Sequence, residues 1–399
     1  MKPVEPYTMA RLSQIFHCFF PSGLRKTLWA QIQPHAYPYR CHPAALPWVL
    51  VHSFVSAMPN LQRIAESYSH TLGTIAKSTL ADLLNNKRVM KLMEALWRAV
   101  EPVDDTRRGR LLAVDTMPIT MPATRRTNAP KLNNNTRGIG ALWSVALDAP
   151  PGQFPVRVIH IPLKPWNDSK LLQEHDLTPK GPTYLLDRGF YSFKLIDRLL
   201  DQKVRFIMRA RKHQMCYSVQ RHLCAPRELP SGIQIELDAV VRLGKARSGP
   251  HPVVRLVRAY LPPNDSGKRE DLFLVTPLTK PAATTILADY RRRDETEKFH
   301  KSLKSSIGLA HLYSFQVNGL LTLLYASLIL AGCIFIMAKQ ADQDLPARVM
   351  TLASLIIFVL NAMRKAKGIA PPCRRNIATK HRWKKRKPKK RTAPRRKAH

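Results

Sequence analysis

The sequence predicts a mixed α/β protein with a mostly helical N-terminal domain and a core that contains a β-rich insertion. Three observations predict this class. Apolar residues over residues 1–105 recur at helical spacing. From about residue 106, short apolar runs bounded by Gly and Pro alternate with helical segments, as in a central sheet. Over about 211–270, alternating segments between Pro and Gly turns predict further strands.

Two amphipathic helices are expected in the N-terminal domain, at Asn60–Ser67 and Ser78–Leu84, on either side of Gly73. This arrangement is typical of a helix-turn-helix, with Lys77 at the start of a candidate recognition helix. A plain helical bundle fits the same pattern, and the sequence leaves both alternatives open. A further helix is expected at Val89–Val100, before a domain boundary near residue 105.

The core is expected to begin with a strand at Arg110–Ile119, followed by a hairpin around Pro150-Pro-Gly152. The hairpin strands and the later core elements are expected at Ala141–Ala149, Phe154–Ile161, residues 168–175 (helix), Tyr184–Leu186, Ser192–Asp201 (helix) and Val204–Arg209. The predicted order is therefore three antiparallel strands followed by alternating helices and strands.

The interval between Asp187 and Glu297 is too long for a simple connection within a core. Strands are expected in this interval at Gly232–Val241, His251–Tyr260 and Asp271–Leu278. The first two lie in a β-rich insertion expected at about 211–270, and a helix is expected afterwards at Pro281–Ser306.

That last helix carries one polar face of unusual composition. Its members fall at positions i, i+3, i+7 and i+14: Tyr290, Arg293, Glu297 and Lys304. At about 100° per residue they share an arc of about 60°, while Phe299 and Leu303 point to the opposite side, toward a core. A carboxylate among cations on one face favours a metal ion held beside a phosphate backbone.

Two further carboxylates are candidates for the same site. Asp115 follows the apolar run Leu111–Val114, and Asp187 follows Tyr184–Leu186, so both are expected at strand ends. Three carboxylates together bind hard divalent cations such as Mg²⁺ or Mn²⁺, and two such ions support phosphodiester chemistry. Taken singly, each acid could instead form a turn or pair with a nearby Lys or Arg.

The spaced tetrad Tyr290, Arg293, Glu297 and Lys304 resembles the signature of the YREK group of bacterial insertion-sequence DDE transposases. The segment Asp187–Phe190 is similar to the block around that family's second aspartate. The resemblance covers about residues 106–340. It implies a ribonuclease H-like core, DNA cleavage and strand transfer, and a synaptic dimer on the terminal inverted repeats and target DNA.

The resemblance also implies roles for single residues. Asp115, Asp187 and Glu297 would be the catalytic metal ligands, with two Mg²⁺ or Mn²⁺ ions. The DNA phosphates would be held by Tyr290, Arg293 and Lys304, with help from Arg188. A ribonuclease H-like nuclease that cuts without joining, or a non-catalytic polycationic DNA-binding protein, remains an alternative.

Members of the resembled family commonly form a hairpin on the flanking DNA end, with a flipped base stacked on an aromatic ring. The six tryptophans of this chain all lie outside the predicted insertion. Phe206, Tyr217 and Tyr260 are therefore the candidates for such a ring, and the sequence does not choose among them.

The charge balance of 65 basic to 27 acidic residues, a formal net charge of +38, predicts a polyanionic partner. Double-stranded DNA is the obvious one. A C-terminal helix is expected at 341–370, followed by a disordered basic tail at 371–399. A tail that only maintains solubility, or a generally basic proteome, is the alternative explanation.

The uncharged run Gly319–Ala338 is long enough to span a bilayer. The resemblance favours instead an apolar helix that packs on the catalytic sheet, so no membrane partner is expected. The six cysteines form no CxxC pair, which fits a reducing compartment, and the N-terminus does not resemble a signal peptide. These features predict a cytoplasmic protein, and the resemblance implies a bacterial one associated with the nucleoid.

Overall fold

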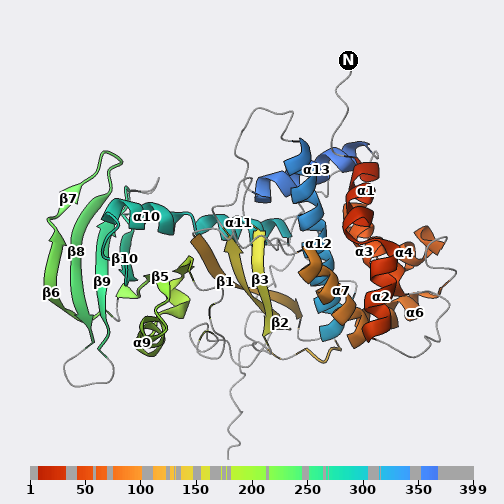
Figure 1. The fold of residues 1–399 in the computed structure, drawn as a ribbon, viewed down its shortest axis with the longest axis horizontal. Coiled ribbons are helices and arrows are strands. Elements are labelled where there is room, and N and C mark those ends of the chain that lie inside the picture. The colour runs from red at the N-terminus through yellow and green to blue at the C-terminus, as the bar shows by residue number, and fades with distance from the viewer. Residues whose placement is uncertain are drawn as a thin grey trace, which may run out of the picture.

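The computed structural model is mixed α/β, with a helical N-terminal region beside a mixed sheet (Figure 1). The predicted fold class is confirmed. The described residues are 8–32, 43–56, 60–69, 75–100, 111–122, 126–129, 131, 136–146, 154–161, 172, 177, 181–212, 215–244, 251–263, 267, 269–303, 314, 316–341 and 352–366. The expected helix at 168–175 and the tail at 371–399 lie outside them, apart from residue 172.

The first five strands form one half of a ten-stranded sheet. They are β1 (Leu111–Pro122), β2 (Thr136–Ala146), β3 (Phe154–Ile161), β4 (Thr183–Leu186) and β5 (Arg205–Arg209). Their spatial order is β3-β2-β1-β4-β5. The first three are antiparallel, whereas β4 is parallel to β1 and β5 is parallel to β4. The helix α9 (Phe193–Asp201) makes the crossover from β4 to β5.

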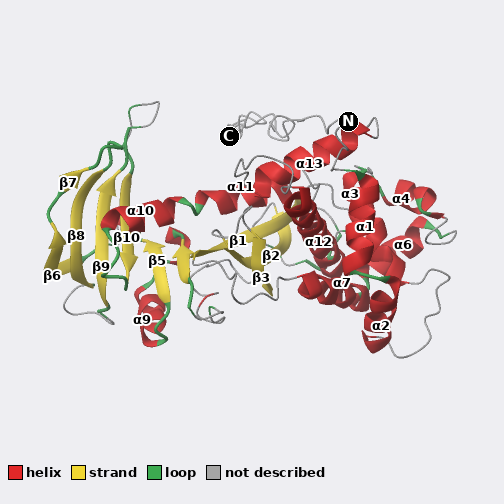
Figure 2. Cartoon of the chain, turned by 45° about the horizontal axis from the view of Figure 1, so that its top comes forward, coloured by secondary structure: helices red, strands yellow, loops and turns green. Residues whose placement is uncertain are grey.

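The strands that follow β5 extend the same sheet and do not form a separate one (Figure 2). They are β6 (Tyr217–Cys224), β7 (Arg227–Glu228), β8 (Gln234–Leu243), β9 (Val253–Tyr260) and β10 (Asp271–Thr276). The connection is made by β10, which pairs antiparallel with β5. The three strand segments expected after Arg209 overlap β8, β9 and β10.

A buried ion pair joins this extension to the loop that follows β10 and leads to the helix with the predicted polar face. Arg255 and Asp238, both nearly inaccessible to solvent, form a bidentate pair at 2.7 and 2.8 Å. The third guanidinium nitrogen of Arg255 donates to three backbone carbonyls after β10, those of Leu278, Thr279 and Pro281. A buried charge whose three nitrogens all donate hydrogen bonds in this way holds the loop in one position.

The segment that follows is two helices and not the single helix expected at Pro281–Ser306. They are α10 (Ala283–Arg291) and α11 (Asp294–Ser302). Backbone bonds at the junction connect residues three apart: Arg293 N–H donates to Tyr290, and Thr296 N–H donates to Arg293. Such a tighter turn changes the direction of the side chains relative to a continuous helix. Lys304 lies outside the described residues.

The helical region surrounds one long apolar helix, α12 (Val317–Ala341). The helices of the N-terminal region and the last helix are α1 (Met9–Phe19), α2 (Ser22–Ile32), α3 (Leu46–Val55), α4 (Leu61–Ser67), α6 (Lys77–Asn85), α7 (Lys87–Val100) and α13 (Leu352–Ala366). Of these, α1, α3, α6, α7 and α13 pack directly against α12. The three helices expected before residue 105 correspond to α4, α6 and α7.

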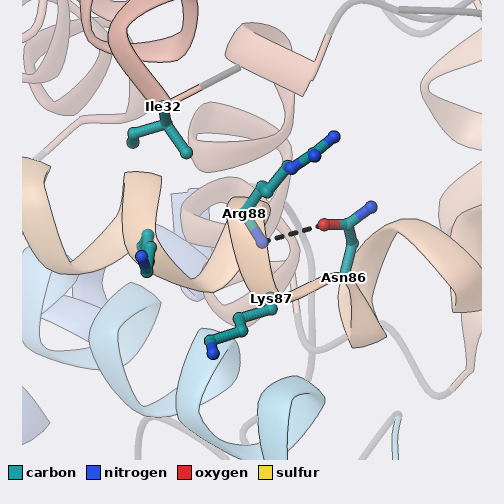
Figure 3. A pocket seen from close by; sticks show the side chains of 5 residues that line it. Ile32, Asn86, Lys87 and Arg88 are labelled. Carbon is teal, nitrogen blue, oxygen red and sulfur yellow. Dashed lines mark hydrogen bonds between the residues drawn. The ribbon is translucent and has the colours of Figure 1, made fainter.

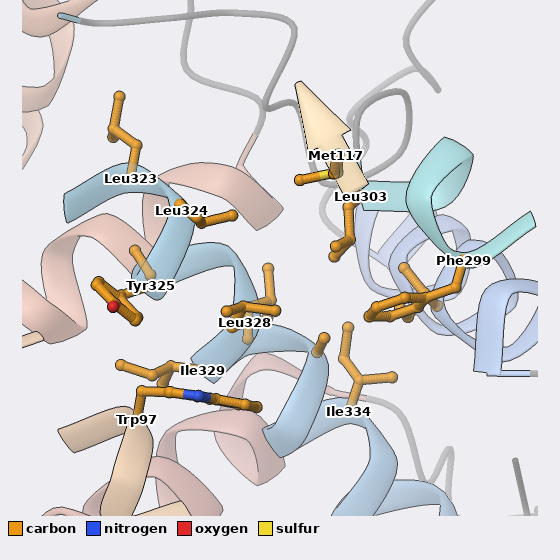
Figure 4. Close-up of a cluster of buried hydrophobic side chains, with 14 of the residues drawn as sticks. Trp97, Met117, Phe299, Leu303, Leu323, Leu324, Tyr325, Leu328, Ile329 and Ile334 are labelled. Atoms are coloured by element: carbon orange, nitrogen blue, oxygen red, sulfur yellow. The ribbon is translucent and has the colours of Figure 1, made fainter. Parts of the chain in front are cut away.

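Burial explains why α12 is so apolar. It is the one helix in the described part of the chain that is long and apolar enough to cross a membrane, and 89% of its window Val317–Ile334 is buried inside the protein. Its side chains pack on Trp97 from α7, on Phe299 from α11 and on Leu303, the residue after α11 (Figure 4). Phe299 and Leu303 are fully buried, as their spacing predicts. Helix α12 therefore connects the helical region to the back of α11.

Candidate active site

Two of the predicted acids are brought together by the register of the sheet. Strands β1 and β4 are parallel, with Val114 opposite Leu186 at the last shared position. Asp115 and Asp187 are the next residues, one on each strand. Asp187 follows the end of β4 as expected, but the prediction that Asp115 ends a strand is wrong. Strand β1 continues to Pro122 because it is paired with β2 along that whole length.

Helix α11 supplies the third acid from above these strands. Its apolar side, with Phe299 and Leu303, is buried in the same core cluster as Met117 of β1 (Figure 4). The polar side of the helix consequently faces the acids. Glu297 lies on this polar side, one turn after Arg293.

The three acids converge on the guanidinium group of Arg293. Its Nη2 atom lies 3.6 Å from Asp115 Oδ1 and 3.6 Å from Asp187 Oδ2. Its Nη1 atom donates a hydrogen bond of 3.2 Å to Glu297 Oε1. Since one nitrogen contacts both aspartates, their nearest oxygens are no further apart than twice 3.6 Å. The structure thus brings together Asp115, Asp187 and Glu297, which are distant in the sequence.

Arg293 was expected to hold a DNA phosphate, and in the structure it contacts carboxylates of the protein. Only 7% of the residue is exposed, and its neighbours are carboxylates. Burial alone would lower the pKa of Arg293, but the charges of Asp187, Asp115 and Glu297, together with the Tyr290 hydroxyl, raise it. Its charge is therefore permanent here, and the i, i+4 ion pair with Glu297 that was the simpler alternative is present.

Tyr290 is also buried, contrary to its expected place on a phosphate-binding face. Its hydroxyl has no hydrogen-bond partner among the described residues. Burial raises the pKa of this hydroxyl, so it stays protonated. Arg188, the fourth predicted DNA contact, is exposed on the turn after Asp187, and its carbonyl accepts a hydrogen bond from the Arg211 side chain.

One residue of the site was missed by the sequence analysis. His300 is buried on α11, and its Nδ1 atom lies 3.2 Å from Asp115 Oδ2. The signal was present in the spacing, because His300 follows Arg293 by seven residues and Glu297 by three, so it lies on their face. The four-residue signature does not include this position, so the resemblance gave no reason to select it.

The pKa of Asp115 reflects the balance of forces in the site. Burial would raise this pKa, but the hydrogen bond and charge of His300, the charge of Arg293 and the Thr116 backbone amide together lower it. The carboxylate is consequently ionised at neutral pH. Side-chain exposure increases from 18% for Asp115 to 32% for Asp187 and 62% for Glu297, so the site opens to solvent on the Glu297 side.

The residues present fit a divalent cation in charge and in ligand type. Three carboxylates are hard oxygen donors, and they already surround a positive group, the Arg293 guanidinium. Among the residues that the structure describes, no three His, Cys, Asp or Glu side chains are close enough to share one ion. The three acids are instead spaced around the Arg293 guanidinium, which each of them contacts.

The aromatic residues considered for base stacking are in different environments. Phe206 is fully buried in β5, so it is part of the core and is not available to a flipped base. Tyr217 and Tyr260 are partly exposed on β6 and β9. The Tyr260 hydroxyl accepts a hydrogen bond of 2.7 Å from Arg258.

A separate basic hollow lies in the helical region, at the start of α7 (Figure 3). Its volume is about 350 Å³, and it is lined by Ile32, Asn86, Lys87, Arg88 and Lys91. The Asn86 side chain accepts a hydrogen bond from the Arg88 backbone amide, which caps the helix. Three cations at a helix N-terminus make this surface attractive to anions.

Comparison with known proteins identifies the family. Residues 109–332 match the model of the transposase DDE domain, a range that contains Asp115, Asp187 and Glu297. The cryo-EM structure of a piggyBac transposase synaptic complex with hairpin DNA is similar at 14% sequence identity and a TM-score of 0.44, covering 94% of this chain and 85% of that one. No curated protein matches the sequence. Because the domain match covers more than half of the chain and all three converging acids, this protein belongs to the transposase DDE domain family.

Proposed function

We propose that this protein is a DDE transposase of the YREK group, encoded by a bacterial insertion sequence, which cuts and joins the ends of its DNA element. The observation that carries this proposal is the convergence of Asp115, Asp187 and Glu297 on a single cationic group. Two adjacent parallel strands and a helix each supply one of these acids. Three separate elements therefore have to be placed together to form the cluster.

Asp115, Asp187 and Glu297 are the residues that would hold the metal. Two bound Mg²⁺ or Mn²⁺ ions would activate an attacking oxygen and stabilise the leaving oxygen of a phosphodiester. The fold would position the acids for this role. The register of β1 and β4 determines the distance between the two aspartates, and the packing of the buried side of α11 determines the distance of Glu297 from them.

Arg293 has two proposed roles that depend on what the acids hold. In this structure it neutralises the three carboxylates. With cations bound by those carboxylates, its guanidinium would be repelled from the site and would be free to contact a phosphate of the bound strand. Lys304 and Arg188 are proposed as further phosphate contacts, and Tyr290 as a residue near the bound DNA.

The DNA itself would be bound along an extended basic surface. The net charge of +38 favours a polyanion. We propose that the N-terminal helices, residues 1–105, bind the terminal inverted repeats, with the start of α6 at Lys77 and the basic hollow of α7 contacting the duplex. The catalytic part would be residues 106–340, and a dimer would join two ends in the bacterial cytoplasm, at the nucleoid.

The test is cleavage and joining of a duplex that carries the terminal inverted repeat found beside the reading frame. Asp115→Asn and Glu297→Gln are expected to abolish strand cleavage while DNA affinity stays within a few-fold of the unmodified protein, because only metal ligation is lost. Glu94→Gln is a matched control, since Glu94 also pairs with an arginine four residues away, on α7. Loss of binding together with cleavage would show a structural role for the acids.

Strand joining separates the proposal from its nearest alternative. A nuclease of the same fold would cut the duplex through the same carboxylates but would not join the freed end to a target. A non-catalytic DNA-binding protein would do neither, and the carboxylate variants would then behave as the unmodified protein in every assay.

A further inference from the structure

His300 connects two elements of the site, helix α11 and strand β1, through its side chain. It belongs to α11, one turn after Glu297, while its Nδ1 atom lies 3.2 Å from Asp115 Oδ2 on β1. Both side chains are largely shielded from solvent, at 9% and 18% exposure. A hydrogen bond between a helix and a strand in such surroundings fixes their relative position more firmly than an exposed one would.

The two oxygens of Asp115 have different neighbours. Oδ2 faces the His300 ring, whereas Oδ1 lies 3.6 Å from the Arg293 nitrogen that also contacts Asp187. Oδ1 is therefore the oxygen turned toward the other acids. In this 3.2 Å contact the carboxylate oxygen is the acceptor, so the close nitrogen of His300 is assigned as the donor.

The His300 ring is itself held by the core. Phe299, the preceding residue, is fully buried, and its ring lies 6.2 Å from the His300 ring, centroid to centroid. Leu303, three residues after His300, is also fully buried. These anchors fix the backbone of α11 on either side of His300. These buried neighbours hold the backbone from which the His300 ring extends toward Asp115.

We propose that His300 is a positioning residue: its Nδ1–H group holds Oδ2 of Asp115, so that Oδ1 faces the cation site, and it fixes α11 with Glu297 at the correct distance from β1. The inference rests on the proposed function, because it takes Asp115 as a metal ligand. Removal of a group that hydrogen-bonds to a metal ligand and so orients it typically weakens metal binding by about 10- to 100-fold.

The experiment uses the full chain without DNA and measures Mn²⁺ affinity by electron paramagnetic resonance. His300→Phe retains the ring shape without a donor, and we expect it to weaken Mn²⁺ binding by about 10- to 100-fold. His300→Asn places an amide N–H near the position of Nδ1, so it is expected to restore the affinity to within a few-fold. His300→Gln, whose amide reaches the position of Nε2 instead, should bind as weakly as His300→Phe.

The control is His222→Phe, since His222 is an exposed histidine on β6.

Thermal unfolding of the same variants excludes a general loss of structure. If His300→Phe does not fold, the comparison of His300→Asn with His300→Gln decides, since the two differ only in where the amide lies. Equal Mn²⁺ affinity for unmodified protein and His300→Phe would overturn the proposal, as would equally weak binding by folded His300→Asn and His300→Gln. If Asp115→Asn binds Mn²⁺ as the unmodified protein does, the proposed function itself fails, and the role of His300 fails with it.

Discussion

Asp115 and Asp187 lie next to each other because their strands are parallel and in register, with Val114 opposite Leu186. Neither residue needs a loop to reach the other, so the pair is as rigid as the sheet. The charged group between them is Arg293, from a helix junction more than a hundred residues further along the chain than Asp187. Two acids on a rigid sheet are therefore balanced by a cation from a separate element.

Replacing Arg293 by Gln is expected to destabilise the protein when divalent cations are absent. The three carboxylates would lose their shared positive charge, at a cost of about 1–3 kcal/mol in the free energy of unfolding. Added Mg²⁺ should raise the melting temperature of this variant more than that of the unmodified protein, because binding to the folded state supplies the missing charge. Differential scanning fluorimetry with and without Mg²⁺ measures both effects.

Arg291→Gln is the control for this prediction, since Arg291 is exposed in the turn before. An unchanged melting temperature for Arg293→Gln, together with a loss of cleavage, would contradict the structural contribution and favour an interaction with the DNA phosphate alone.

Lys304→Ala is expected to behave differently from Arg293→Gln. Its proposed partner is the DNA, so the melting temperature should not change, while single-turnover cleavage and binding to pre-cut ends should both decrease. Normal cleavage by this variant would remove Lys304 from the proposed set of phosphate-binding residues.

The ionisation of Asp115 predicts how stability depends on pH. The pKa of Asp115 is lowered in the folded protein, where burial is outweighed by His300 and Arg293. Because the pKa is lowered on folding, the ionised carboxylate stabilises the folded state at every pH above the pKa of the unfolded chain, which is about 4. This stabilisation is lost as the pH falls through the lower pKa of the folded protein. The difference in free energy of unfolding between the unmodified protein and Asp115→Asn should therefore be largest near neutral pH and shrink below about pH 4. Urea unfolding at several pH values measures it, and a constant difference would contradict the prediction.

Breaking the buried pair of Arg255 and Asp238 is expected to destabilise the fold at a distance from the acids. Arg255→Ala leaves Asp238 buried without its cation and frees three carbonyls before α10, a loss of about 3–5 kcal/mol. Arg98→Ala removes an exposed ion pair with Glu94 and should cost no more than about 0.5 kcal/mol. Chemical denaturation of the two variants is the measurement, and similar losses would show that the buried pair has no special role.

Removing residues 374–399 is expected to weaken DNA binding without changing its sequence preference. This segment has 14 basic residues among its 26, and cations that bind phosphate carry no sequence information. The plot of log affinity against log salt should become less steep by about 0.9 for each phosphate that the shortened protein no longer neutralises. A fall in the ratio of specific to random DNA affinity would show instead that the segment contributes to recognition.

Periodicity predicted most of the elements, and its errors have a common origin. Asp115 was expected at a strand end, and β1 instead continues past it to Pro122, because pairing with β2 extends the strand. The helix expected at Pro281–Ser306 is divided at Arg293, although no Gly or Pro marks the division. In both cases tertiary partners outweighed the local preference of the chain.

The sequence by itself determined which residues could form the site and which side of the last helix is apolar, because spacing alone decides which side chains share a face. Only the tertiary structure decided what that face meets. Arg293 and Tyr290 were expected to hold DNA phosphates and are buried, and the role proposed for His300 depends on Asp115 lying beside it. The physical reason is that a charged face is stable either in water or against opposite charges. The opposing charges here come from Asp115 on β1 and Asp187 after β4. Tertiary folding, and not the local sequence of the helix, brings these strands beneath it.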